Sequence, residues 1–150
     1  MRLSARVDYA LRAVVELAAT EGERLVTAER LARNQGIPGK FLENIMVQLR
    51  RGGIVNAQRG AEGGYFLARP AKDINLAEII RVIDGPLAHV RGHRPELLGY
   101  QGSAKALQQV WIALRCVERQ ILEQVTVADV ATNRLPESIQ AYVSDPQAWK

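Results

Sequence analysis

The feature that most constrains the fold is the stretch 37–70, where a helical pattern leads into a glycine pair and two short apolar runs. At about 100° per residue, one face of the expected helix 40–51 is apolar. That face consists of Leu42, Ile45, Met46 and Leu49. The opposite face carries mainly cations and polar groups and consists of Lys40, Glu43, Asn44, Val47, Arg50 and Arg51. Gly52-Gly53 is expected to end the helix, because glycine adopts the left-handed cap conformation without a Cβ penalty.

Two strand-like runs, 54–59 and 65–69, follow the glycine pair and predict a β-hairpin. Their connection, residues 60–64, is too long for a two-residue turn and too rich in glycine for a helix. A helix that exposes cations and precedes such a hairpin is typical of a DNA-recognition helix and its wing. The alternative is a helix and a hairpin that only pack together in a small α+β domain.

The segment before this stretch completes a helix-turn-helix pattern. Ser4 is expected to cap a first helix over residues 4–20, which ends in a turn at 21–23. Thr27 is expected to cap a second, short helix, and residues 34–36 form the turn that leads into the recognition helix. The sequence therefore predicts a second helix that is presented to a partner by its N-terminus.

A resemblance to a known family rests on three segments, MRLSARVDYALRAV, PGKFLENIMVQLRRGGIVNAQRGAEGGYFLARP and INLAEIIRVIDGPL. In the same order and spacing, they are similar to the winged helix-turn-helix transcriptional regulators of the IscR/NsrR/CymR type. The similarity covers nearly the whole chain, and the wing pattern RG-x-x-GGY-x-LAR is its most specific part. The resemblance implies a mainly α fold with a small β-hairpin, a long dimerisation helix and a role in transcription.

The candidate DNA contacts lie mostly on the recognition helix and the wing. The first residues of such a helix enter the major groove deepest, where a lysine can donate to guanine and a glutamate can accept from cytosine. Arginine on a wing suits a phosphate or a narrow minor groove. The expected DNA-binding residues are Arg2, Thr27, Gly39, Lys40, Glu43, Asn44, Val47, Arg50, Arg51, Arg59 and Gly60.

The distribution of charge supports this assignment. Residues 1–72 hold 12 Lys and Arg against 7 Asp and Glu, whereas residues 73–150 hold 8 against 9. Cations therefore concentrate in the half with the expected DNA-reading parts, although differences of this size also arise by chance. The sequence shows no 18-residue apolar run and no signal peptide, so we expect a cytoplasmic protein with no membrane partner.

A long apolar stripe beyond the winged region predicts a dimer interface. Ser103 is expected to cap a helix that runs to about residue 125, with seven apolar residues in one arc. These residues are Leu107, Val110, Trp111, Leu114, Val117, Ile121 and Val125. The alternative is that the stripe packs on the chain's own winged domain. We expect residues 1–85 to form the winged domain, 86–102 an irregular connection, 103–131 the dimerisation helix and a docking helix, and 132–150 a tail.

The chain departs from the cluster-binding members of the family. The resemblance places three cysteines within residues 88–103, but this segment has none, and the single Cys116 lies in the long helix. His89 and His93 are four residues apart, yet Gly92 and Pro95 make a metal-binding helix unlikely to form there. We therefore predict no metal and no cofactor.

The sequence predicts a DNA-binding transcriptional regulator, with double-stranded DNA, a second copy of the chain and an unidentified small-molecule or protein effector as partners. We expect a repressor that binds an inverted-repeat operator as a homodimer. The alternatives are a protein–protein interaction module on a winged-helix scaffold, or a regulator gated by a small ligand, a metal or thiol oxidation. No catalytic triad or paired carboxylates are recognisable, so an enzyme is not expected.

Overall fold

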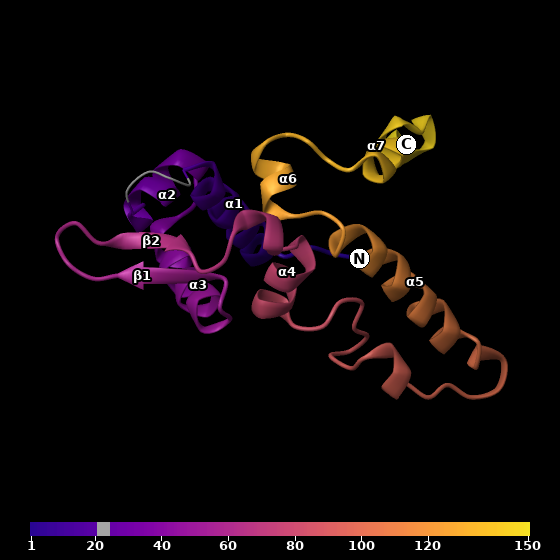
Figure 1. The fold of residues 1–150 in the computed structure, drawn as a ribbon. Coiled ribbons are helices and arrows are strands. Elements are labelled where there is room, and N and C mark those ends of the chain that lie inside the picture. Colours follow the sequence, from indigo (N-terminus) through magenta and orange to yellow (C-terminus); the bar gives the residue numbers. More distant parts are fainter. Residues whose placement is uncertain (21–24) are drawn as a thin grey trace.

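The computed structural model describes residues 1–20 and 25–150 and is mainly helical, with one two-stranded antiparallel sheet among these residues (Figure 1). This confirms the predicted fold class. The turn expected at residues 21–23 lies outside the described residues. Figure 1 shows α1 (Ala5–Ala19), α2 (Ala28–Gln35), α3 (Gly39–Arg51) and the hairpin gathered on one side, whereas the long helix α5 (Leu107–Leu122) extends away from them.

Side-chain caps define the starts of the first two helices. α1 spans Ala5–Ala19, and the Ser4 hydroxyl accepts from the Val7 backbone N–H at 3.2 Å. α2 spans Ala28–Gln35, and the Thr27 hydroxyl accepts from the Arg30 N–H at 3.2 Å. Both caps lie where the sequence predicts them, because Ser and Thr satisfy N–H groups that have no partner within the helix.

The recognition helix and the wing follow directly. α3 spans Gly39–Arg51, and the left-handed residue after it is Gly53, with φ of 73°. The strands β1 and β2 span Val55–Gln58 and Gly64–Leu67 and are shorter than predicted. Their register pairs Val55 with Leu67 and Gln58 with Gly64.

A third segment pairs with the hairpin and ties it to the helix-turn-helix. Val26 forms an isolated antiparallel bridge with Tyr65, through N···O distances of 3.1 and 2.8 Å. A Cβ on Gly64 would lie 2.8 Å from the Val26 carbonyl oxygen, so only glycine allows this approach. The start of β2 is thereby held against the chain that leads into α2.

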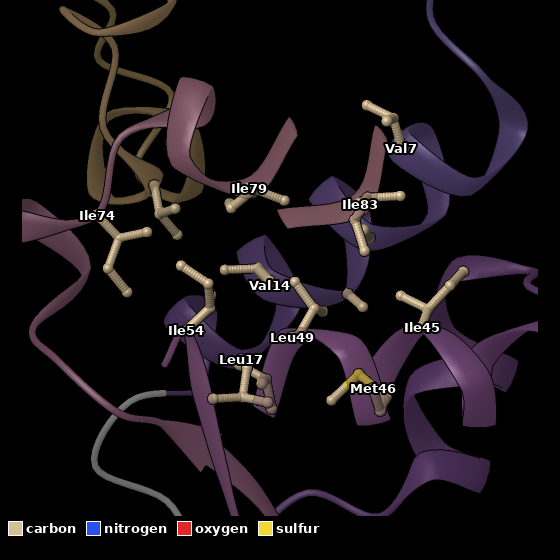
Figure 2. Packing of buried hydrophobic residues seen from close by; sticks show 14 of the residues in the cluster. Val7, Val14, Leu17, Ile45, Met46, Leu49, Ile54, Ile74, Ile79 and Ile83 are labelled. Carbon is tan, nitrogen blue, oxygen red and sulfur yellow. The ribbon is translucent and has the colours of Figure 1, made fainter. Parts of the chain in front are cut away.

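One hydrophobic core joins the winged region (Figure 2). Its α3 contribution is the predicted apolar face, in which all four side chains have 0% exposure. α4, Leu76–Asp84, begins with a capping box between Asn75 and Glu78 and buries Ile79, Ile80 and Ile83. α6, Val127–Ala131, packs against α1 and adds the fully buried Val127 to the same core.

The segment between α4 and α5 is irregular, with two 3-10 turns, Pro95–Leu97 and Gly102–Ala104. Val90 and His93 form an isolated bridge around Arg91 and Gly92, which both have positive φ. His89 and His93 therefore do not share a helix face.

α5 is shorter than predicted at both ends. It spans Leu107–Leu122, because Ser103 lies within the preceding 3-10 turn and no side chain caps the helix start. Val125 lies beyond the helix, where its carbonyl oxygen accepts from the Leu76 N–H at 3.0 Å.

The C-terminal region contains a helix where the sequence predicted a looser tail. α7 spans Glu137–Ser144 and is followed by a 3-10 turn, Pro146–Trp149. Tyr142, Val143 and Trp149 were considered as anchors, but all three are exposed. Ile139 is the buried residue of α7, and it lines a cavity together with residues from the end of α5 and from the segment after α6.

Candidate nucleic-acid interface

Arg12 on α1 holds the turn between α2 and α3. Its Nη1 donates to the Gln35 carbonyl oxygen at 2.5 Å, and its Nη2 lies 2.9 Å from an Asp8 carboxylate oxygen. The guanidinium carbon lies 5.0 Å from the centroid of the Tyr9 ring. Because these contacts use the planar, multidentate guanidinium, lysine could not replace them. Sequence analysis did not identify Arg12, since its partner lies 23 residues away.

Glu16 provides a second contact between α1 and the same turn. Its two carboxylate oxygens accept from Asn34 Nδ2 at 2.8 Å and from Gln35 Nε2 at 2.7 Å. The end of α2, which leads into the turn, is therefore bonded to α1 through one backbone and two side-chain groups, and this helps to set the direction in which α3 leaves the turn. A recognition helix must be oriented in this way before its side chains can reach base edges.

The outward face of α3 is the predicted one. Lys40, Glu43, Asn44, Val47, Arg50 and Arg51 are all exposed. Phe41 is also exposed, by 56%, and its ring centroid lies 6.3 Å from that of Tyr9. Phe41 was not predicted to lie on either the apolar or the outward face of α3. Its exposure places an aromatic group at the N-terminal end of the helix, among the candidate base contacts.

The wing projects beyond the helical body (Figure 1). Arg59 and Gly60 are exposed at its loop, and Gly60 has a φ of 118°. A Cβ on Gly63 would lie 2.2 Å from the Gln58 carbonyl oxygen, so the loop closes only with glycine there. Phe66 on β2 is 40% exposed and was not among the predicted contacts.

Two of the predicted DNA-binding residues, Thr27 and Arg2, have neighbours outside the recognition helix. Thr27 is exposed, but its hydroxyl already caps α2. Arg2 lines a cavity with Trp111 and Leu114 of α5. Arg6, near the start of α1, contacts α3 instead, since its Nη2 donates to Gln48 Oε1 at 2.6 Å.

The predicted dimerisation stripe divides into a covered and an open part. Val125 is buried, and Trp111 and Ile121 are half-buried against the chain's own residues. The open part is exposed by 39–52% and consists of Leu107, Val110, Leu114 and Val117. Packing on the chain's own residues therefore accounts for part of the stripe, and the dimer interface stays a prediction for the rest. Packing on the winged region covers one edge, and the other edge has no cover within the described chain.

Glu118 lies within this stripe and was missed. At about 100° per residue it falls in the same arc, four residues after Leu114 and seven after Trp111. It is 8% exposed, and neither carboxylate oxygen has a hydrogen-bond partner among the described residues. The signal was available in the sequence, since a carboxylate interrupts an otherwise apolar arc.

An ion-pair network fastens α4 to α5. Arg81 Nη2 on α4 lies 2.5 Å from a Glu123 carboxylate oxygen, and Arg119 Nε on α5 lies 3.0 Å from the same oxygen. The pKa of Glu123 is lowered chiefly by the hydrogen bonds that its carboxylate accepts from Arg119 and, to a smaller extent, from Arg81. The same contact raises the pKa of Arg119.

The donor groups do not fit an iron–sulfur cluster or a metal ion. No group of three or more His, Cys, Asp and Glu residues in the described ranges is arranged to hold a metal. Cys116 is a free, exposed thiol on α5, and Gln120 Nε2 approaches its sulfur at 3.8 Å. Protein-held clusters need several thiolate ligands, which one cysteine per chain cannot supply.

Within the described residues, no helix is both long and apolar enough to cross a membrane.

Comparison with known proteins agrees with the geometry of α2, α3 and the wing. Residues 3–133 match the model of the Rrf2 family, described as "Iron-dependent Transcriptional regulator". A putative HTH-type transcriptional regulator of Mycobacterium tuberculosis, Rv1287, is 46% identical over 148 residues, which cover 99% of this chain and 92% of the relative. The regulator CymR of Bacillus subtilis is 32% identical over 132 residues, covering 88% and 91% of the two chains.

Solved structures give the same result. CymR of B. subtilis, described as the global cysteine regulator, superposes with a TM-score of 0.76 at 30% identity, covering 89% of this chain and 98% of that one. IscR of T. potens superposes with a TM-score of 0.72 at 28% identity, covering 100% and 97%. These relatives are transcriptional regulators and not enzymes. By family match, identity and fold, the chain belongs to the Rrf2 family of DNA-binding transcriptional regulators.

Proposed function

We propose that this chain is a transcriptional repressor that binds an inverted-repeat operator as a homodimer and holds no iron–sulfur cluster. The observation that supports it most is the outward face of α3, which exposes cations and base-reading groups beside a glycine-rich wing. Charged groups are common on solvated helix faces, but here they lie on the second helix of a helix-turn-helix, next to a projecting hairpin. Family membership supports the general role in DNA binding.

The N-terminal half of α3 reads the bases in this proposal. Gly39 allows close approach of the backbone, Lys40 donates to guanine, and Glu43 accepts from the amino group of cytosine. Asn44, one turn after Lys40, reads adenine, and Val47 contacts a thymine methyl group. All five residues are exposed, so none of them has to leave the core to reach DNA.

The remaining candidates hold the phosphate backbone. Arg50 and Arg51 lie at the C-terminal end of α3, and Arg59 and Gly60 lie in the wing loop. Such contacts are independent of sequence and release counterions, so they make affinity fall as salt rises. Thr27 and Arg2 have weaker support, because one already caps a helix and the other lines a cavity beside α5.

The open part of the α5 stripe supports a homodimer. Four neighbouring apolar residues with 39–52% exposure form a patch that a second copy can cover by the same patch of its own. Two-fold symmetry then requires an operator with two inverted half-sites, about one helical turn or ~34 Å apart. An A·T-rich operator suits a wing arginine in a narrow minor groove.

The absence of a cluster follows from the donor set and not from the family description. Purified anoxically, the protein is expected to be colourless, without stoichiometric iron or sulfide. Ultraviolet–visible spectra with iron and sulfide analysis test this point. A brown protein with both elements present would contradict it.

Selection of binding sites from random DNA, followed by footprinting, tests the DNA proposal. We expect an inverted repeat protected over two successive major grooves. A single, non-repeated site would overturn the dimeric arrangement. A failure to bind any DNA would instead favour a protein-interaction module, which no contact in the described structure supports.

A further inference from the structure

A cavity of about 290 Å³ lies between the N-terminus, the end of α4 and one edge of α5. Its walls come from residues 1–3, residues 84–90 and three α5 side chains, Trp111, Leu114 and Glu118. Its volume is close to the lower bound of small-molecule sites in proteins, roughly 300 Å³. It therefore suits a compact organic ligand.

Glu118 is the unusual group in this wall. It is 8% exposed, both of its carboxylate oxygens are buried, and neither accepts a hydrogen bond from the described residues. A buried carboxylate without a donor is unfavourable, because it has lost water and gained no partner. A donor that enters the cavity would recover this loss.

The cations that neighbour Glu118 on α5 are already engaged elsewhere. Arg115 pairs with Glu96, and Arg119 pairs with Glu123. The indole N–H of Trp111 donates to the Tyr100 hydroxyl at 3.0 Å. None of these three donors reaches Glu118, and its carboxylate accepts no hydrogen bond from Arg2 of the cavity lining either. A donor that enters the cavity would supply the missing contact.

The rest of the cavity defines the ligand further. Its walls include apolar side chains such as Ile80, Leu87 and Leu114, which suit a hydrocarbon or aromatic body. A second carboxylate, Asp84, lines the cavity and accepts from the Ser4 hydroxyl at 2.7 Å. Arg2 and His89 are further ionisable side chains of the lining, and both residues are exposed.

We propose that this cavity binds a small organic cation, with an apolar body and one amidinium, guanidinium or ammonium group that donates to Glu118. Such a charge-assisted hydrogen bond is among the stronger polar contacts in proteins. A competing occupant is an arginine of a second copy of the chain. The two are distinguished by whether a free small cation binds the intact protein.

The position of the cavity connects a ligand to DNA binding, an extension that rests on the proposed function. The cavity touches α5 and the N-terminal residues that lead into α1. Ser4, which caps α1, bonds to Asp84 in the cavity wall. A bound ligand would therefore fasten α5 to the helix that holds the turn before α3, and so alter the orientation of two recognition helices in a dimer.

The site is tested with benzamidine on the full-length protein without DNA, using benzamide as the uncharged compound of the same shape. Calorimetric titration should show that the wild type binds benzamidine about tenfold or more tightly than benzamide. Glu118→Gln keeps the size of the side chain and should remove this preference. Glu137→Gln, an equal charge change on the exposed face of α7, should retain it.

Equal affinity of the wild type for the two compounds would overturn the proposal, and this result does not depend on any variant folding. A preference that survives in Glu118→Gln would overturn it as well. If Glu118 is paired with a second copy instead, the wild type will show no preference and Glu118→Gln will weaken the dimer in sedimentation.

A fluorescence readout locates the ligand. Trp149→Phe leaves Trp111 as the single tryptophan, because the chain has two. Benzamidine should then change the emission of Trp111, and an unchanged emission would place the binding elsewhere. The regulatory extension is tested separately by fluorescence anisotropy of a selected operator with and without benzamidine. Loss of operator binding under both conditions would contradict the proposed function, while the calorimetric result on the ligand site would stand.

Discussion

On α3, Leu42, Ile45 and Leu49 are fully buried, whereas on α5 Val110, Leu114 and Val117 are 40–52% exposed. Both helices are amphipathic, and both were expected to bury their apolar faces. The winged region completes its core within one chain, through α1, α4, β1 and α6 (Figure 2). α5 extends away from that core and leaves much of its apolar face open (Figure 1).

The difference shows that an apolar stripe predicts burial but not the partner that provides it. Short connections bring α1, α2 and α3 back on one another, so their faces are covered locally. α5 is reached only through the long irregular segment after α4 and touches the winged region along one edge. The two regions should therefore respond differently to substitution.

The largest effect is expected from charges on the open edge of α5. Leu114→Glu combined with Val117→Glu should convert the proposed dimer into monomers, because each burial of an unpaired charge costs about 3–5 kcal/mol. We expect at least about a 100-fold weaker self-association, with the winged region still folded. Sedimentation velocity measures the self-association, and circular dichroism measures the folding.

Gln120→Glu is the control on the same helix, since Gln120 lies outside the apolar arc. A dimer that survives the double change would show that the interface lies elsewhere.

The next effect is expected in the core of the winged region. Leu49→Ala should lower the free energy of unfolding by about 2–5 kcal/mol, because it leaves a cavity in a fully packed cluster. Urea denaturation measures it. Val47→Ala, on the exposed face of the same helix, should change stability by no more than about 0.5 kcal/mol. Equal costs at both positions would contradict the division of α3 into a core face and an outward face.

A smaller effect should distinguish the residue that reads a base, Glu43, from the residue that contacts the DNA backbone, Arg59. Glu43→Ala should keep overall affinity but reduce discrimination at one base pair per half-site by roughly 1–3 kcal/mol, because a carboxylate facing the groove is tolerated only opposite a cytosine amino group. Arg59→Ala should weaken binding to operator and unrelated DNA by similar factors and lower the salt slope by about one unit.

Site selection with both variants, at several salt concentrations, checks these roles. Arg134→Ala serves as a control, because Arg134 is an exposed cation after α6 and outside the predicted contact set. The assignment is reversed if Arg59→Ala changes the selected sequence while Glu43→Ala only weakens binding uniformly.

The smallest effect concerns acid stability at the α4–α5 junction. Arg119 and Arg81 hold the pKa of Glu123 below its ordinary value. Their contribution to stability is therefore complete above the ordinary carboxyl pKa, about 4.3, and is lost as the pH falls through the lowered value. Glu123→Gln should lower the melting temperature slightly at neutral pH and reduce its fall on acidification, measured by scanning from pH 7 to pH 3. Glu137→Gln should leave that fall unchanged, and an equal response of both variants would assign it to general charge effects.

Much of the winged region was predictable because its signals are local. The caps at Ser4, Thr27 and Asn75 and the apolar face of α3 all depend on residues within one or two turns of one another. The start of α5 was misplaced for a related reason. Ser103 resembles a cap in sequence, but the chain around it forms a separate 3-10 turn before the helix begins. The helix in the tail was missed because residues 137–144 carry a weak pattern between two prolines.

The sequence by itself determined the mainly α fold, the order of the helices and the outward face of α3, since spacing of apolar residues and caps acts along the chain. Only the tertiary structure decided which edge of α5 is covered, that Arg12 and Glu16 hold the turn before α3, and that Arg2 lies beside α5. Each of these depends on segments far apart in the chain, such as residues 1–3 and Trp111 at one cavity. Periodicity assigns a residue to one face of a helix. Which faces contact one another depends on how the connections allow the helices and strands to pack, and no single segment of the sequence contains that information.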